Sequence, residues 1–397
     1  MGIRNYYSQI TSVSGKKGHR ILELSDEMLL WLLGMLSNFP SPPPLDGPEW
    51  DVLIQNLQEQ GFTGYLYYIC SKTPMDMRPP DRIWKELTRS SHQISVNHLF
   101  YEQQLATIEE ELKKAHIRYL LVKGMALGYQ VYPSPTFRPF RDIDLLIPHE
   151  NIRIASDIFQ NMGYCLMFDG YNVSSDLYHH QVLHPPPGCR YISVEIHWRP
   201  LNNSGEKSGI RVDALFGSSC LITTLWGSFR TFSLEDALLY ASLHMCTQHP
   251  GEIRLIWMAD IVFLIQAISK QDLWVKVIER APLWKGGSAL ARTLELTSLW
   301  FGVSPPPQGD VYGSSASDDL QCLITADRII TRREHKVLSQ MHRMSTLSGK
   351  FLVLFHYFAA TRAVHMICES PSLREYGKIW FSILKITLRT WRQDSQR

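Results

Sequence analysis

The residues best suited to chemistry lie in the segment RPFRDIDLLIP at 138–148. Side chains at positions i and i+2 of a β-strand point to the same face, so Asp142 and Asp144 would project together while Ile143 points into the sheet. Two carboxylates this close repel each other unless cations lie between them. The spacing therefore fits a site that holds two divalent ions for phosphoryl chemistry. The alternative is an edge strand whose solvent face carries two acids.

Two neighbouring segments favour the metal site over the edge strand. LLVKGMALG at 120–128 is typical of a strand, a glycine and then a helix. In that geometry, backbone N–H groups at the helix N-terminus can receive phosphate oxygens. The segment 194–197 alternates like a strand and directs Glu195 and His197 to one face. A third carboxylate from a separate strand would complete the ligand set of a two-metal phosphoryl-transfer site.

In sequence order, these segments resemble the DNA polymerase β-type nucleotidyltransferase superfamily. The motifs K-G, R-P-x-x-D-I-D-L-L-I, G-Y and V-E-I-H-W follow one another within about residues 95–265. They are most similar to a bacterial branch usually described as the uncharacterised nucleotidyltransferase family. The resemblance implies that Asp142 and Asp144 bind both metal ions, Mg²⁺ or Mn²⁺. It also implies that Glu195 is a third metal-binding acid near the acceptor and that Gly124 is the phosphate-loop glycine.

Two features differ from the general pattern of the superfamily. Met125 stands where a second Gly or a Ser is usual, and the gap from Gly124 to Asp142 is longer than in most members. Both features suit the bacterial branch, but they weaken any inference about which nucleotide is used.

The reaction implied by the resemblance is transfer of a nucleoside monophosphate from an NTP to an acceptor, with release of pyrophosphate. One ion would orient the triphosphate, and the other, with Glu195, would lower the pKa of an acceptor hydroxyl. Members of the branch are often associated with bacterial biosynthetic clusters, including those for modified peptides. That association implies a small-metabolite or peptide acceptor.

The sequence is also compatible with two other functions. One is a toxin-type nucleotidyltransferase that modifies tRNA, and the other is an inactive module that binds a nucleotide or a partner on the same fold. The net charge of +2 counts against a nucleic-acid partner, because RNA binding usually leaves a basic patch.

Cationic residues near the motifs are candidates for contacts with the phosphates. Lys123 and Arg138 bracket the expected phosphate path, and either could neutralise charge on the leaving pyrophosphate. Arg254 begins an R-x-x-W-x-x-D run that resembles one in the bacterial branch. The alternatives are that Arg138 pairs with a nearby carboxylate and that the run forms a salt-bridged seam between helices. The expected nucleotide-binding residues are Lys123, Gly124, Arg138 and Arg254.

Four histidines, His179, His180, His184 and His197, lie around the expected strands. Zinc takes imidazole ligands, but the spacing of these residues fits none of the common zinc-binding patterns. A polar cleft lined by histidines is the favoured interpretation.

The elements that must position these residues fall into three zones. The expected fold class is α+β, with a mixed nucleotidyltransferase-type sheet. Residues 1–80 are expected to form a helical N-terminal cap, 81–232 the nucleotidyltransferase core, and 233–397 a helical C-terminal domain. The expected elements of the core are a long helix over 81–114, strands at 118–122, 142–147, 164–168 and 191–198, intervening helices at 124–132 and 149–162, and an antiparallel hairpin over 179–198.

The cap is expected to hold two helices separated by a proline-rich break at 40–48, and the C-terminal domain is expected to be mostly helical, with a loop at 304–315. The predicted helices cover 22–33, 48–61, 255–268, 271–280, 288–301, 320–344, 349–369 and 374–392.

The composition sets limits on the kind of protein. A length of 397 residues suggests two or three domains. The longest apolar run, 255–268, has 14 residues and contains Asp260, so it is too short to span a bilayer. The N-terminus lacks the apolar stretch of a secretory signal. The chain has seven cysteines, and this odd number argues against a framework of paired disulfides. We therefore expect a cytoplasmic protein with no membrane span.

Overall fold

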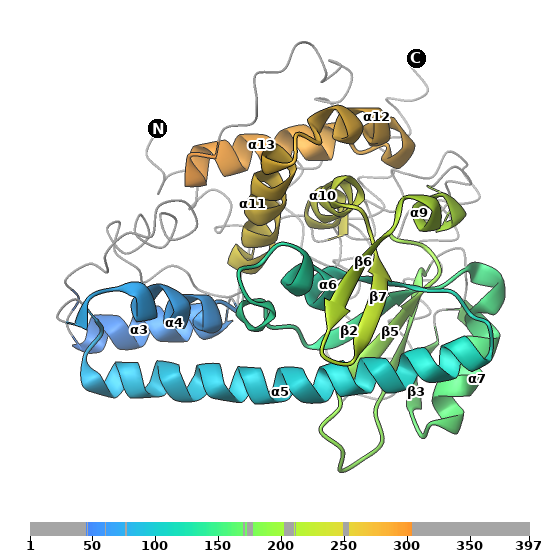
Figure 1. Ribbon diagram of the computed structural model, residues 1–397, viewed down its shortest axis with the longest axis horizontal. Helices are drawn as coiled ribbons and strands as arrows, with labels where there is room; N and C mark the ends of the chain where they lie inside the picture. Colours follow the sequence, from blue (N-terminus) through green and yellow to red (C-terminus); the bar gives the residue numbers. More distant parts are fainter. Residues whose placement is uncertain are drawn as a thin grey trace, which may run out of the picture.

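The computed structural model describes most of residues 45–303, with gaps at 46, 60, 76–77, 170, 173–177, 202–209, 211 and 249–253. Within these residues, one mixed sheet carries helices on both faces (Figure 1). The expected α+β class is thus confirmed. The predicted helices at 22–33, 320–344, 349–369 and 374–392 lie outside the described residues.

The sheet has seven strands in the order β3-β4-β5-β2-β1-β7-β6. Its central strand, β2 (Asp142–Leu146), pairs in parallel with β5 (Ser193–His197) and antiparallel with β1 (Leu120–Val122). The predicted antiparallel hairpin is confirmed by the pairing of β4 (His180–His184) with β5. The remaining strands are β3 (Cys165–Asp169), β6 (Cys220–Thr224) and β7 (Gly227–Thr231).

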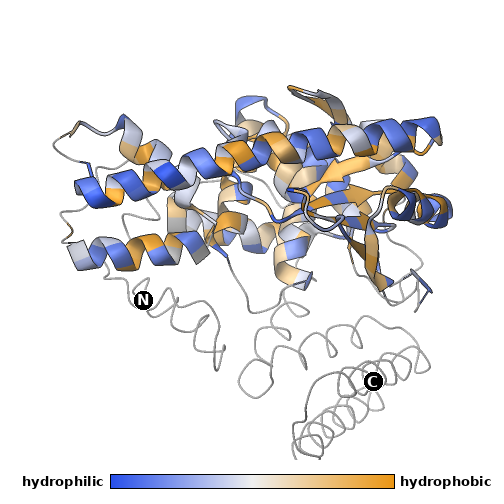
Figure 2. Cartoon of the chain, turned by 90° about the horizontal axis from the view of Figure 1, so that it is seen from below, coloured by the Kyte–Doolittle hydropathy of each residue, from blue (hydrophilic) through white to orange (hydrophobic). Residues whose placement is uncertain are grey.

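One face of the sheet packs against α5 (Asp81–Lys114) and α7 (Ile152–Asn161). The 34-residue helix α5 also extends past the sheet to α3 (Gly47–Glu59) and α4 (Thr63–Lys72), as Figure 1 shows. Figure 2 shows hydrophilic and hydrophobic residues interleaved along α5, next to strands that are mostly hydrophobic. This pattern is expected of a surface helix that buries one stripe. The buried contacts of α5 with the sheet come from Leu105, Ile108 and Leu112.

The opposite face of the sheet is covered mainly by helices from the C-terminal part of the described chain. These helices are α10 (Leu234–Leu243), α11 (Leu255–Lys270), α12 (Trp274–Trp284) and α13 (Gly287–Phe301). Their buried residues form one hydrophobic cluster with α3, α4 and the β1 residues Leu120 and Val122. The N-terminal and C-terminal helical regions therefore share a core. The boundaries 1–80, 81–232 and 233–397 stay a prediction. Shorter elements are α6 (Lys123–Gln130), α9 (Val212–Ser218), η2 (Pro135–Phe137), η3 (His149–Asn151) and η4 (His244–Gln248).

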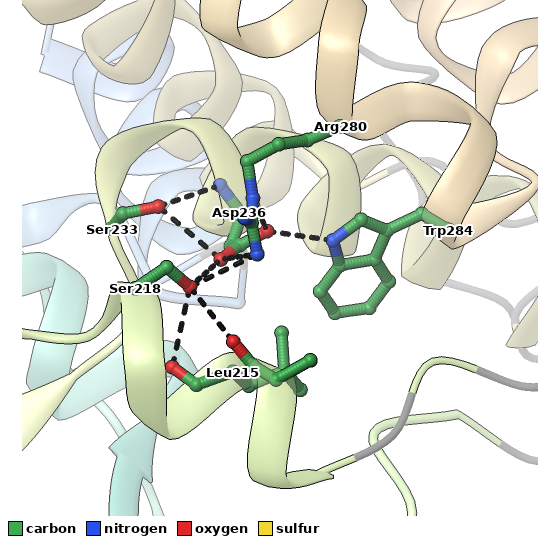
Figure 3. Close-up of polar contacts among 7 residues, drawn as sticks. Leu215, Ser218, Ser233, Asp236, Arg280 and Trp284 are labelled. Atoms are coloured by element: carbon green, nitrogen blue, oxygen red, sulfur yellow. Dashed lines mark hydrogen bonds and ion pairs between the residues drawn. The ribbon is translucent and has the colours of Figure 1, made fainter.

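A buried ion pair fixes this helical layer (Figure 3). The carboxylate of Asp236 on α10 is fully buried and accepts two hydrogen bonds from Arg280 of α12, at 2.5 and 2.6 Å. The Trp284 Nε1–H and the Ser218 hydroxyl also donate to it, at 2.8 and 2.7 Å. The Ser233 hydroxyl accepts a hydrogen bond from the Asp236 backbone N–H and so caps the N-terminus of α10. Because all of these donors converge on one carboxylate, α9, α10 and α12 are held together.

Among the described helices, none combines the length and apolarity needed to cross a membrane. The apolar helix α11 has 16 residues, and Asp260 is buried within it.

Candidate active site

The register of β2 and β5 brings the three predicted acids together. Asp144 lies directly opposite Glu195 in the parallel pair, so both side chains leave the same face of the sheet. Asp142 precedes Asp144 by two residues and shares that face. The intervening Ile143 and Val194 are fully buried on the other face, in the cluster that contains α5. The alternation seen in the sequence thus places the acids as expected, on the side of the sheet covered by α10.

Lys123 supplies a positive charge at the centre of this cluster. Its ammonium nitrogen lies 2.6 Å from Asp144 Oδ1 and 3.5 Å from Glu195 Oε2. The residue follows β1 directly, and its φ of 59° is in the left-handed region that is unfavourable for residues other than glycine. Burial opposes the charge, but the carboxylate of Asp144 raises the pKa of Lys123 well above its ordinary value. Lys123 therefore stays protonated among the acids.

His197 joins the same carboxylates from the end of β5. Its Nε2 lies 2.9 Å from Asp144 Oδ1 and 3.3 Å from Glu195 Oε2, and its side chain is 2% exposed. Burial and Lys123 oppose its protonation, yet the hydrogen bonds to Asp144 and Glu195 raise the pKa of His197. Burial disfavours the Glu195 charge, but the bond to His197 and the charge of Lys123 lower the pKa of Glu195 well below its usual range.

Asp142 differs from Glu195 in that its ionised form is disfavoured. Burial, together with the charge of Asp144, raises the pKa of Asp142 to about 7. A cation bound at this edge would relieve the repulsion between the two acids. Ligand atoms of Asp144, Glu195 and His197 lie within 4.8 Å of one another. Carboxylate oxygens are the ligands that Mg²⁺ prefers, so the residues present fit such an ion.

Sequence reasoning placed Lys123 on the phosphate path and did not anticipate its contacts with the acids. It also missed Tyr240 of α10, which is 5% exposed. Burial raises the pKa of the Tyr240 phenol. The negative charge of Asp144 adds to this increase, and the positive charge of Lys123 opposes it. Tyr240 therefore lies close enough to the charged residues of the site to interact with them. Tyr240 sits within an apolar helical stretch, where nothing in the sequence distinguishes it from a core residue.

Gly124 is the second residue of α6, so the predicted order of strand, glycine and helix is present. A Cβ at Gly124 would lie 2.8 Å from Phe140 Cβ and 3.3 Å from Arg138 Nη1. The absence of a side chain therefore lets α6 approach the segment that leads into β2. Whether Gly124 also contacts phosphate stays a prediction.

We expect Gly124→Ala to destabilise the protein by about 1–3 kcal/mol, because Phe140 Cβ is fixed to the backbone and must shift. Nucleotide affinity should fall with it, since the displaced segment carries Asp142. Denaturant unfolding and nucleotide titration check both effects. Gly287→Ala is the matched control, because nothing lies within 4 Å of a Cβ at Gly287. Equal stability of the two variants would contradict the close approach.

Arg138 is 8% exposed and forms a two-pronged ion pair with Asp260 of α11, at 2.7 and 2.8 Å. Its Nη1 donates to the Pro139 carbonyl at 2.7 Å, and Tyr132 donates to the same Asp260 carboxylate at 2.7 Å. All three guanidinium nitrogens thus have protein acceptors. These contacts support the alternative that Arg138 is the structural partner of a carboxylate. Its expected contact with the nucleotide stays a prediction.

Arg254 immediately precedes α11, and its guanidinium lies 5.4 Å from the ring centroid of Trp257. The Trp257 ring in turn meets His244 edge-on at 5.5 Å. Burial and the positive charges of Arg141 and Arg138 lower the pKa of Arg254. Arginines therefore concentrate next to β2, where phosphate oxygens would be attracted. The role of Arg254 in nucleotide binding remains a prediction.

Three of the four histidines gather beside the acids. Ligand nitrogens of His179, His180 and His197 lie within 4.8 Å of one another. His184 is separate, since it is exposed and lies 3.0 Å from the hydroxyl of Ser193. Burial and the neighbouring His197 lower the pKa of His179 well below its ordinary value and that of His180 to about 4.

Two solved structures are similar to this chain. The antibiotic-resistance factor ANT(2'')-Ia is 14% identical, with a TM-score of 0.34, and the match covers 52% of this chain and 96% of that chain. An antigenic nucleotidyltransferase-like protein from Paracoccidioides brasiliensis is 14% identical, with a TM-score of 0.29 and coverage of 47% and 92%. These TM-scores are too low to carry an argument. A comparison with curated proteins gave no match.

The sequence pattern of the family described as "uncharacterised nucleotidyltransferase" matches residues 46–302. This span includes β1, β2, β5 and α11, and it makes up more than half of the chain. It bears out the expectation, drawn from the D-I-D and V-E-I-H-W motifs, of a nucleotidyltransferase. The chain therefore belongs to the uncharacterised nucleotidyltransferase family.

Proposed function

We propose that this nucleotidyltransferase moves a nucleoside monophosphate from an NTP to a hydroxyl group of a small metabolite or peptide and releases pyrophosphate. Asp142, Asp144 and Glu195 would hold Mg²⁺ or Mn²⁺. The observation that supports this most is the register of β2 and β5, which sets Asp144 directly opposite Glu195 with Asp142 on the same face. Three carboxylates from two strands are the donor set that phosphoryl-transfer metal sites use.

The charge of the cluster supports a cation at this place. Burial and the charge of Asp144 raise the pKa of Asp142 to about 7 even though the Lys123 ammonium lies 2.6 Å from Asp144, so a further positive charge beside these acids would be favourable. When bound, Mg²⁺ would neutralise charge on the triphosphate and lower the pKa of the acceptor hydroxyl.

The chain's own residues would bind and orient the substrates. Glu195 is less buried than Asp144, with 22% of its side chain exposed against 2%, so it is the acid better placed to meet an acceptor. Lys123 lies between the two acids and would supply positive charge as pyrophosphate leaves. Arg254, with Arg141 beside it, would attract the triphosphate. Positioning and charge neutralisation supply most of the rate in such reactions.

The two other candidate functions differ from this proposal in their acceptor or in their lack of catalysis. A tRNA acceptor is disfavoured by the net charge of +2. An inactive binding module is disfavoured because all three acids are present and share one face of the sheet. The cytoplasmic location expected from the sequence stays a prediction.

The donor and the acceptor can be identified together. The purified full-length protein would be incubated with a cell extract, Mg²⁺ and each NTP labelled at the α-phosphate. We expect one NTP to label a small metabolite or peptide and to release pyrophosphate. A label that enters tRNA would support the toxin-type alternative. Failure of all four NTPs to give any product, with NTP binding intact, would support the binding module.

Glu195→Gln should lower the transfer rate by about 10²–10⁴-fold while changing Mg·NTP affinity by less than about tenfold. The reason is that Glu195 would hold only the ion next to the acceptor, whereas Asp142 and Asp144 would hold both ions. Single-turnover kinetics and calorimetry measure the two quantities separately. Glu150→Gln, at an exposed position after β2, is the control. Loss of nucleotide binding together with activity would refute this division of roles.

A further inference from the structure

The backbone fixes three histidines at one end of the β4–β5 pair. His180 lies directly opposite His197 in the antiparallel ladder, so both side chains leave the same face. The Trp198 N–H donates to the His179 carbonyl at 3.0 Å, which continues the ladder by one more bond. The arrangement is therefore set by strand pairing and does not depend on a loose surface loop.

The donor atoms of this cluster are spaced for one shared ion. The ligand nitrogens of all three residues lie within 4.8 Å of one another. Nδ1 of His179 is 3.5 Å from Nδ1 of His180. Tetrahedral zinc with bonds of about 2.0–2.1 Å needs nitrogen atoms about 3.4 Å apart. The first pair already meets this requirement, and a ligand nitrogen of His197 lies within 4.8 Å of both.

His197 shows the hydrogen-bond pattern of a metal ligand. Its Nε2 lies 2.9 Å from Asp144 Oδ1, while its buried Nδ1 has no hydrogen-bond partner among the described residues. A buried nitrogen without a partner costs free energy, so it calls for an explanation. Histidines that bind metals with one nitrogen usually give the other to a carboxylate, which orients the ring.

We propose that His179, His180 and His197 form a binding site for a zinc-type divalent cation. Imidazole nitrogens suit zinc and similar transition metals, whereas Mg²⁺ prefers the oxygens of the neighbouring acids, so the two sites would take different ions. Three protein ligands leave the fourth tetrahedral position for water or a substrate oxygen. The proposal departs from the sequence interpretation of these residues as a polar cleft, because it rests on their contacts in space and not on their spacing in the sequence. It does not depend on the proposed nucleotidyl transfer.

The proposal is tested by measuring zinc binding to the full-length protein. The protein is first freed of metal and is then titrated with zinc chloride in a calorimeter. Metal analysis after gel filtration gives the stoichiometry. We expect one zinc ion per chain, and we expect His179→Ala and His180→Ala each to weaken its binding at least about 100-fold. His184→Ala is the matched control, because this exposed histidine lies on the same strand and outside the cluster. It should leave zinc binding unchanged.

Further variants test whether zinc binds to the three histidines or to the neighbouring acids. Asp142→Asn should keep zinc binding. If Asp142→Asn loses zinc while His180→Ala retains it, the ion binds the carboxylates and the proposal is wrong. No zinc bound by the unaltered protein would also overturn it. Because a histidine variant could unfold, circular dichroism of each variant is recorded, and His180→Gln gives a second substitution. Cobalt in place of zinc adds a visible spectrum that should change in the His179 and His180 variants only.

Discussion

Asp142→Asn and Asp144→Asn should each lower nucleotidyl transfer by about 10³-fold or more, because each removes a charged metal ligand. Their effects on the stability of the metal-free protein should differ. Asp144 pairs with Lys123 and His197, so its loss leaves buried positive charge and should cost about 3 kcal/mol. Burial and Asp144 raise the pKa of Asp142 to about 7, so replacing its carboxylate by a neutral amide should cost nothing or should stabilise the protein.

Steady-state transfer assays and denaturant unfolding without metal measure these two effects. Asp157→Asn, on the exposed side of α7, is the matched control for loss of one carboxylate. Transfer at nearly the unaltered rate by either site variant would rule out the metal assignment. Equal stability changes in both would contradict the unequal pairing of the two acids.

Arg138→Ala should destabilise the protein by about 3–5 kcal/mol, because it leaves Asp260 buried without its partner. If Arg138 acts only through this pair, NTP and NMP affinities should fall by the same factor. Melting temperature and both affinities are measured on the same variant. A normal melting temperature with a selective loss of NTP affinity would instead show that Arg138 contacts the β- and γ-phosphates.

The control for this variant is Arg82→Ala. Arg82 pairs with Asp51 at 2.7 Å with both side chains more than half exposed, so its loss should cost less than about 1 kcal/mol. The double variant Arg138→Ala/Asp260→Ala removes both buried charges and should recover part of the lost stability. No recovery would mean that Asp260 depends on partners other than Arg138.

Local patterns were enough to predict the acids and their common face. The alternation of Asp142, Ile143 and Asp144 determines which side chains share a face, and it requires no knowledge of neighbouring strands. The pairing of Asp144 with Glu195 depends on a parallel register between segments about 50 residues apart. The family resemblance implied that Glu195 is the third acid, but neither it nor the local pattern predicted this register.

Contacts that depend on backbone conformation or distant packing could not be predicted. Lys123 reaches the acids because its φ is 59°, a conformation that its residue type disfavours. Arg138 and Asp260 are 122 positions apart, and their pairing depends on how α11 packs on the sheet. The strands β6 and β7 were also missed. Their two-residue turn is Leu225 and Trp226, which lacks the Asn, Asp or Gly that usually marks a hairpin.

Asp142, Asp144 and Glu195 should form a metal-dependent nucleotide site. Calorimetric titration of the full-length protein with a non-hydrolysable NTP, with and without Mg²⁺, measures this dependence. We expect tight binding only when Mg²⁺ is present, and we expect it to weaken at least about 100-fold in Asp142→Asn. Equal NTP affinity without Mg²⁺, or full affinity in Asp142→Asn, would contradict the claim.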